Sequence, residues 1–135
     1  MMREHYELIA QQENDPGLLA EVRSLLPRIF EFSELLAHRL GADDAGAAFP
    51  HGVTYHPSCH SLRALQLGDA PVRLLQLVRG LELIDLPNQE QCCGFGGTFS
   101  VKNADVSVAM LSEKNKEVLK TGAKVVTALD NSCLM

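Results

Sequence analysis

Positive charge and long apolar runs are both scarce in this chain of 135 residues. Its 12 Lys and Arg are outnumbered by 17 Asp and Glu, which gives a net charge of −5, and no basic cluster stands out. Because nucleic-acid binding relies on a basic surface, we expect no nucleic-acid partner. No stretch approaches the ~18 apolar residues of a membrane span, so we expect no direct membrane insertion either.

A secretory leader is also missing from the first residues. The segment MMREHYELIAQQEND has no apolar core like that of a signal peptide. We therefore expect a cytoplasmic protein, and in that compartment grouped cysteines more often bind metal or react than form disulfides. Hydrophobic residues make up 46% and charged residues 21%, a balance typical of one globular domain.

The first 49 residues are predicted to be helical. Apolar spacing predicts one helix over 3–12 and a longer helical stretch from Pro16 to Leu40, capped by Asp15 and kinked or split at Pro27. A loop of small residues is expected over 42–52.

From residue 50 the predicted order is strand, helix, helix, strand, glycine-rich loop, helix, strand. The strands are GVTYH, LELIDL and AKVVTAL, and the last helix covers 103–121. The near-continuous apolar run of the last strand predicts burial on both faces. This order indicates an α/β fold: a small parallel β-sheet flanked by helices with Rossmann-like layering, preceded by N-terminal helices.

Each of the four cysteines follows one of these strands. Cys59 comes after GVTYH, Cys92 and Cys93 after LELIDL, and Cys133 after AKVVTAL. Because the carboxyl ends of parallel strands share one edge, where ligand sites form, we expect the four thiols to meet there. Thiolates from three loops suit zinc or an iron–sulfur cluster. A redox disulfide and plain buried packing are the alternatives.

The cysteine pair opens the segment QCCGFGGT, which is rich in glycine. Gly94, Gly96 and Gly97 allow positive φ angles, and their N–H groups could point at sulfurs and tune a redox potential. The motif GFGGTF is not a dinucleotide fingerprint, because it lacks the third glycine of G-x-G-x-x-G and no helix is expected to start within it.

Three side chains near Cys59 are further candidates. His60 is favoured over His56 as an added ligand or supporting group, since it adjoins Cys59. Arg63 lies one helical turn away and could offset thiolate charge, or could simply be an exposed helix residue. A cysteine hydrolase is not favoured, because the side chains of sequence neighbours usually point apart.

The spacing of Cys59, then 32 residues, then CCG and a later cysteine resembles the cysteine-rich CCG domain family. Such domains occur in heterodisulfide reductase subunits and in the iron–sulfur subunits of glycolate oxidase and lactate-utilisation systems. The phrases HPSCH, CCGFGGTFSVK and DNSCLM are most similar to the lactate and glycolate branch. The resemblance covers about residues 50–135 and implies an iron–sulfur cluster, of 4Fe–4S type, held by the four cysteines.

The resemblance also implies a larger assembly. It suggests a non-catalytic electron-transfer component of a complex that oxidises a 2-hydroxy acid such as L-lactate or glycolate, with the other subunits as partners. Family members typically carry two repeats, so 1–49 would be an N-terminal helical segment that packs on the domain and links it to a preceding repeat, and 50–135 would be the cysteine-rich CCG domain.

One departure from the family pattern concerns the last cysteine. Relatives often carry Cys-x-x-Cys where this sequence has only Cys133. Four thiolates fit an ordinary cluster or a zinc ion, and they put in doubt the five-thiolate cluster of heterodisulfide reductases. A zinc-binding structural or assembly domain and a thiol–disulfide module remain the alternatives.

Overall fold

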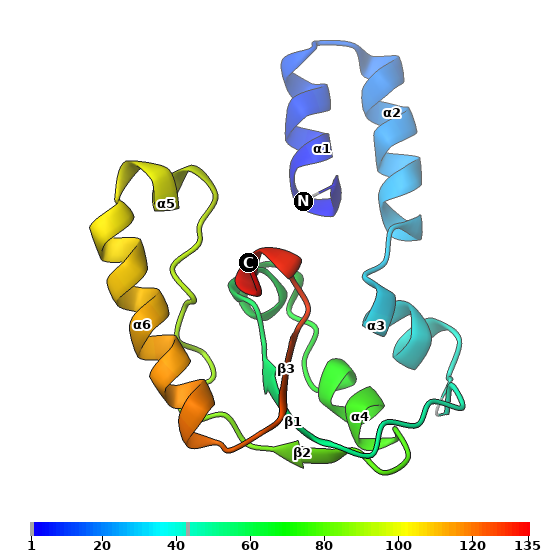
Figure 1. The fold of residues 1–135 in the computed structure, drawn as a ribbon. Helices are drawn as coiled ribbons and strands as arrows, with labels where there is room; N and C mark the ends of the chain where they lie inside the picture. Colours follow the sequence, from blue (N-terminus) through cyan, green and yellow to red (C-terminus); the bar gives the residue numbers. More distant parts are fainter. Residues whose placement is uncertain (1, 43) are drawn as a thin grey trace.

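A computed structural model describes residues 2–42 and 44–135. At its centre is a three-stranded parallel sheet in the order β2–β1–β3 (Figure 1). The strands are β1 (Gly52–His56), β2 (Glu82–Ile84) and β3 (Val125–Ala128), and both neighbours of β1 run parallel to it. The predicted α/β fold with a small parallel sheet is therefore confirmed.

The central strand β1 is the most consistently buried of the three strands. Its last four residues, 53–56, are all buried. Thr54 lies opposite both Ile84 and Val126, and its hydroxyl donates a hydrogen bond to the Ile84 carbonyl at 3.0 Å. Because side chains alternate along a strand, Tyr55 and His56 point to opposite faces of the sheet. These two faces differ in what covers them.

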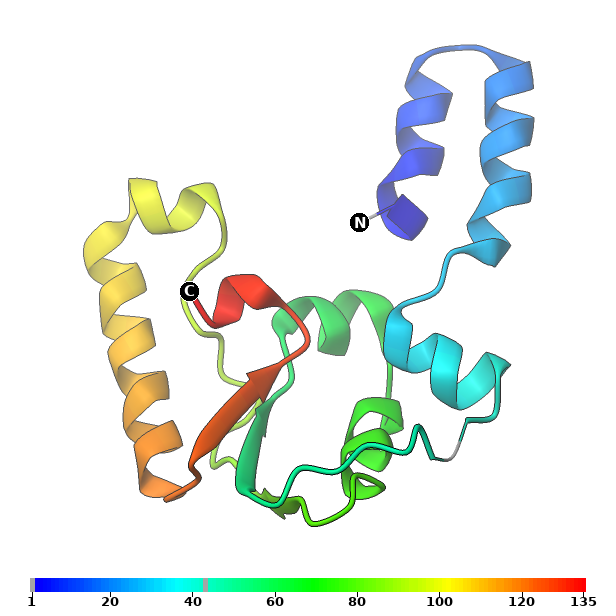
Figure 2. The same cartoon turned by 45° about the vertical axis from the view of Figure 1, so that its right-hand side comes forward.

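Helices cover both faces (Figures 1 and 2). The face of His56 is covered by α6 (Ala104–Lys120), and the face of Tyr55 by α3 (Phe32–Glu34) and α4 (Ala70–Gln76). Among residues 2–42 and 44–135, no helix is long and apolar enough to cross a membrane.

The N-terminal helices α1 (Met2–Gln12) and α2 (Pro16–Leu25) form an antiparallel hairpin that extends away from the sheet in both views. Asp15 accepts hydrogen bonds from the first turn of α2, as its capping position predicts. The predicted break at Pro27 is confirmed, because a 3₁₀ turn, η1 (Leu26–Arg28), separates α2 from α3. A π-helical turn, η2 (Leu35–Arg39), then ends the helical stretch.

The loop predicted over 42–52 is confirmed in part. Its described residues form no helix, and apart from one isolated bridge between Ala48 and Arg79 they form no strand before Gly52 begins β1. Residue 43 lies outside the described residues.

One expectation about burial was wrong. Strand β3 is not buried on both faces: Val125 and Val126 are 36% and 37% exposed. The reason is that β3 is an edge strand of the described sheet, with β1 as its neighbour. The N-terminal helical stretch also exposes several apolar side chains, with Phe32 at 69%. Because the hairpin extends from the sheet, α1 and α2 pack mainly on each other.

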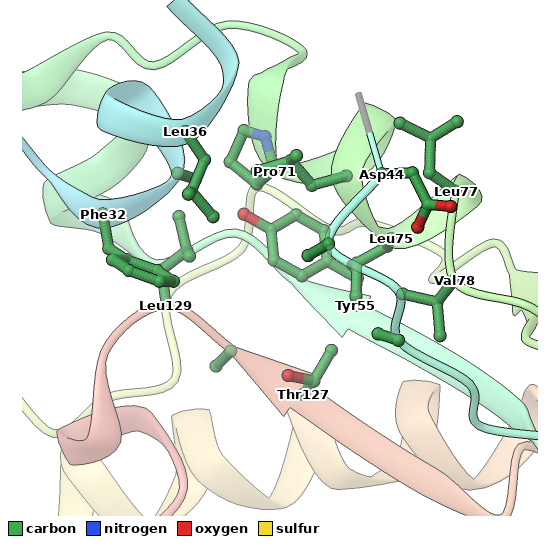
Figure 3. A pocket seen from close by; sticks show the side chains of 15 residues that line it. Phe32, Leu36, Asp44, Tyr55, Pro71, Leu75, Leu77, Val78, Thr127 and Leu129 are labelled. Carbon is green, nitrogen blue, oxygen red and sulfur yellow. The ribbon is translucent and has the colours of Figure 1, made fainter. Parts of the chain in front are cut away.

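An apolar pocket of about 250 Å³ lies on the Tyr55 face. Figure 3 shows the Tyr55 ring inside it, surrounded by side chains that include Leu36, Pro71 and Leu75. Burial, and after it the negative charge of Glu31, raises the pKa of Tyr55 to about 12. The Tyr55 hydroxyl therefore stays protonated in this apolar surrounding.

This pKa predicts a loss of stability at high pH. An unfolded tyrosine loses its proton near pH 10, whereas folded Tyr55 keeps it to about 12. The unfolded state thus binds fewer protons in between, so the Tyr55 contribution is complete below pH ~10 and falls as the pH rises towards 12. The chain has two tyrosines, so Tyr6→Phe leaves Tyr55 as the only source of tyrosinate absorbance. We expect a titration midpoint near 12, and a midpoint near 10 would contradict the burial.

Candidate metal centre

The four cysteines lie at the carboxyl end of the sheet. Cys59 stands where β1 passes into a π-helical turn, η3 (His60–Leu65), and Cys133 ends a 3₁₀ turn, η4 (Asn131–Cys133), after β3. Cys92 and Cys93 lie in the loop that follows β2. In Figures 1 and 2 the turns η3 and η4 lie at this same end of the sheet. All four cysteines are free thiols.

The thiols approach one another as two pairs. Burial raises the pKa of Cys59, and its hydrogen-bonding neighbour Cys92 raises it further, while Arg63 lowers it. Burial, followed by the hydrogen bond with Cys93, raises the pKa of Cys133 to about 12. The structure therefore brings all four predicted thiols together. Because thiolates at this spacing repel one another, a cation would stabilise their ionised form.

The cysteine pair is held by Gly94 and helix α6. The Gly94 N–H donates to the Cys92 sulfur at 3.3 Å, and the Ser107 hydroxyl of α6 donates to the Gly94 carbonyl at 2.9 Å. Gly94 has a φ of +90°, and a Cβ there would lie 2.7 Å from the Ser107 carbonyl oxygen. The close approach of α6 to the loop thus requires glycine.

Gly96 and Gly97 turn the chain into a short helix. Both have positive φ angles, of 57° and 61°. Helix α5 (Thr98–Lys102) begins directly after Gly97, so the expectation that no helix starts within GFGGTF was wrong. The turn is closed when Ser100 N–H bonds to the Gly97 carbonyl at 3.2 Å. A direct role of these two glycines at the thiols remains a prediction.

His56 is a site residue that sequence reasoning ranked below His60. A ring nitrogen of His56 and the sulfurs of Cys93 and Cys133 lie within 4.8 Å of one another. His56 is 3% exposed, and neither ring nitrogen has a hydrogen-bond partner among the described residues. Burial lowers the pKa of His56, and the positive charge of Lys114 lowers it further. The backbone of Gln89 raises this pKa, as the smallest of the three effects.

The structure places His60 beside a carboxylate, Asp130. Hydrogen bonds from Ser132 lower the pKa of Asp130, and the charge of His60 adds to this effect. His60 therefore lies close to Asp130, and its role as a ligand remains a prediction. The signal that could have identified His56 is strand alternation, which puts it on the opposite face from Tyr55 and towards α6.

Lys114 is a second residue that the sequence did not reveal. It is 3% exposed, and its ammonium group donates to the carbonyls of Asn88 at 2.9 Å and Gln89 at 3.3 Å. Burial lowers the pKa of Lys114, and the charges of Cys59, Cys93 and Cys92 raise it. In the run SEKNKE this lysine reads as a solvated surface residue, so no local pattern separates it from Lys116.

The donor atoms at this site suit a soft metal. Four sulfurs and one imidazole converge, and the imidazole nitrogens are buried without partners. A buried polar atom without a partner costs stability, unless a bound group satisfies it. Thiolate and imidazole are the ligands of zinc and of iron–sulfur centres, so the residues present fit either group.

The fold and the site together define a cysteine-rich α/β domain whose His/Cys group could bind a metal. A family model described as "Cysteine-rich domain" (CCG) matches residues 53–135. The chain therefore belongs to the CCG cysteine-rich domain family, and the resemblance inferred from its motifs is confirmed.

Three relatives illustrate the comparison with whole proteins. The chain is 43% identical over 123 residues to "Lactate utilization protein A" of Oceanobacillus iheyensis, a match that covers 91% of this chain and 50% of that protein. Over 135 residues it is 40% identical to the protein of the same name from Lysinibacillus sphaericus and 39% identical to that from Bacillus subtilis. These two matches cover 100% of this chain and 58% and 56% of the relatives. The chain thus spans about half the length of these relatives.

Proposed function

We propose that this domain holds an iron–sulfur cluster of 4Fe–4S type and transfers electrons within a lactate-utilisation protein. The observation that carries the proposal is the convergence of four thiols from three loops at one edge of the sheet. The ligands would be Cys59, Cys92, Cys93 and Cys133.

The pairing of the thiols favours a cluster over a single ion. Cys92 approaches Cys59, whereas its neighbour Cys93 approaches Cys133. Adjacent cysteines that reach towards different partners can bind different irons of one cluster. When bound, such a cluster would accept and release electrons. The chain itself would hold the sulfurs, direct the Gly94 N–H at Cys92 and keep water from Cys93, which is 6% exposed.

The wider assembly is inferred from the relatives. Their name, "Lactate utilization protein A", favours L-lactate over glycolate as the 2-hydroxy acid that is oxidised. The substrate chemistry would take place in partner subunits of a cytoplasmic complex. A preceding CCG repeat would be a further partner of this domain, as the family resemblance implies.

Anaerobic reconstitution tests the proposal. The chain is purified without oxygen, supplied with iron and sulfide, and assayed for both elements per chain and for visible absorbance. We expect a brown protein with about four irons. A colourless protein that carries zinc instead would contradict the cluster assignment.

A zinc site is the second candidate, and His56 is the observation that favours it. The His56 imidazole lies beside the thiols of Cys93 and Cys133, and with a third cysteine of the site these residues would supply the Cys₃His ligand set of structural zinc sites. If zinc is the native metal, His56→Leu should weaken zinc affinity by at least about tenfold in a chelator competition. If the four cysteines hold a cluster, the same variant should load iron normally. His38→Leu is the matched control, because His38 is an exposed histidine of η2, and it should bind as the wild type does.

A further inference from the structure

Helix α6 carries a positive charge into the interior beside the cysteine group. Lys114 lines the same cavity, of about 180 Å³, as His56 and Cys133. Lysine is rarely as buried as this, with 3% of its surface exposed, unless its charge is compensated. The contacts of its ammonium group show part of that compensation.

Two backbone carbonyls provide the first part of the compensation for the Lys114 charge. The ammonium group donates to Asn88 and Gln89, so it ties α6 to the loop that leads into the cysteine pair. The Asn88 carbonyl also accepts the N–H of Gln91 at 2.9 Å, which closes a turn just before Cys92. Lys114 therefore helps to set the position from which Cys92 and Cys93 reach into the site.

The carbonyls are neutral, so the remaining compensation must come from negative charge. The described groups whose negative charge favours the ammonium form are three thiols of the site and Glu117, one turn along α6. Glu117 itself accepts an ion pair from Lys120 at 2.7 Å. The thiols are thus the partners that the cavity offers Lys114.

We propose that Lys114 is a positioning residue of the metal centre, whose charge offsets the thiolates and raises the reduction potential of the bound cluster. The inference rests on the proposed function. Reduction adds a negative charge to a cluster that already has thiolate ligands, and a fixed cation at this place favours the reduced form. A zinc site would gain affinity from the same charge.

The test compares three variants of the anaerobically loaded chain. Lys114→Gln keeps a hydrogen-bond donor and removes the charge, while Lys114→Arg keeps the charge. Lys116→Gln is the matched control, because Lys116 lies on the same helix with its side chain 62% exposed. We expect Lys114→Gln to lower the reduced-to-oxidised ratio at a fixed potential about tenfold, or ~59 mV for one electron. Lys114→Arg and Lys116→Gln should stay closer to the wild type.

Cluster loading and reduction potential of these variants test the role of Lys114. A loaded Lys114→Gln protein with an unchanged potential would overturn the inference, as would equal loss of loading in the folded Arg and Gln variants. Loading that is lost in Lys114→Gln and retained in Lys114→Arg would support it. If the wild type takes up zinc only, the readout is zinc affinity, which Lys114→Gln should weaken about tenfold. A wild type that binds neither group would refute the proposed function itself.

Discussion

Replacing Cys93 by serine is expected to abolish cluster loading and to leave the sheet folded. Cys93 is the most buried of the four cysteines and lies beside both Cys133 and His56. Serine has nearly the same shape, but its hydroxyl is not a thiolate ligand, so the change removes a ligand without opening a large cavity. Iron and sulfide per chain after identical anaerobic reconstitution, together with circular dichroism, measure the two effects.

The control for this prediction is Val101→Ser on the surface of α5, where the side chain is 82% exposed. This variant should load as the wild type does. If the Cys93→Ser protein also loads fully, Cys93 is not a ligand and the four-thiol site is wrong.

Gly94→Ala is expected to destabilise the apo protein by about 2–6 kcal/mol. The added Cβ would lie 2.7 Å from the Ser107 carbonyl oxygen and 2.9 Å from the Met110 Cβ, at a backbone φ of +90°. Strain at such a φ and overpacking each cost roughly 1–3 kcal/mol. The clash would also push α6 away from the cysteine loop, so loading should fall as well. Urea unfolding of the metal-free chain measures the loss.

Gly97→Ala separates the two causes. Gly97 also has a positive φ, but a Cβ there would meet no atom within 4 Å. It should therefore cost only the backbone strain, roughly 1–3 kcal/mol, and less than Gly94→Ala. Equal losses for the two variants would show that α6 does not press on Gly94 as the structure describes.

Much of the architecture was readable from the sequence because it depends on local signals. Short apolar runs between helical segments indicated parallel strands, and the order of elements indicated one sheet. Cys59 and Cys133 are far apart in the chain, yet the rule that parallel strands end at a common edge predicted their meeting. The cap at Asp15 and the break at Pro27 were likewise local and were confirmed.

The remaining features depend on which surfaces pack against each other, and a short segment of sequence does not determine that packing. Sequence adjacency favoured His60, but the face of β1 decides that His56 lies at the thiols. Lys114 and Lys116 look alike in the run SEKNKE, and only the loop at Asn88 makes one of them a buried residue. The apolar run of β3 predicted full burial, whereas its place at the sheet edge leaves Val125 and Val126 more than a third exposed.

The parallel arrangement of the strands also determines how late in synthesis the four thiols can come together. The thiols follow three different strands, and the central one must pair with both others before they converge. If the four cysteines hold a metal as proposed, the complete ligand set forms only after Cys133 has been synthesised and β3 has docked. Until that point the thiols of Cys59, Cys92 and Cys93 would lie on a chain that lacks the complete site, where oxygen could oxidise them.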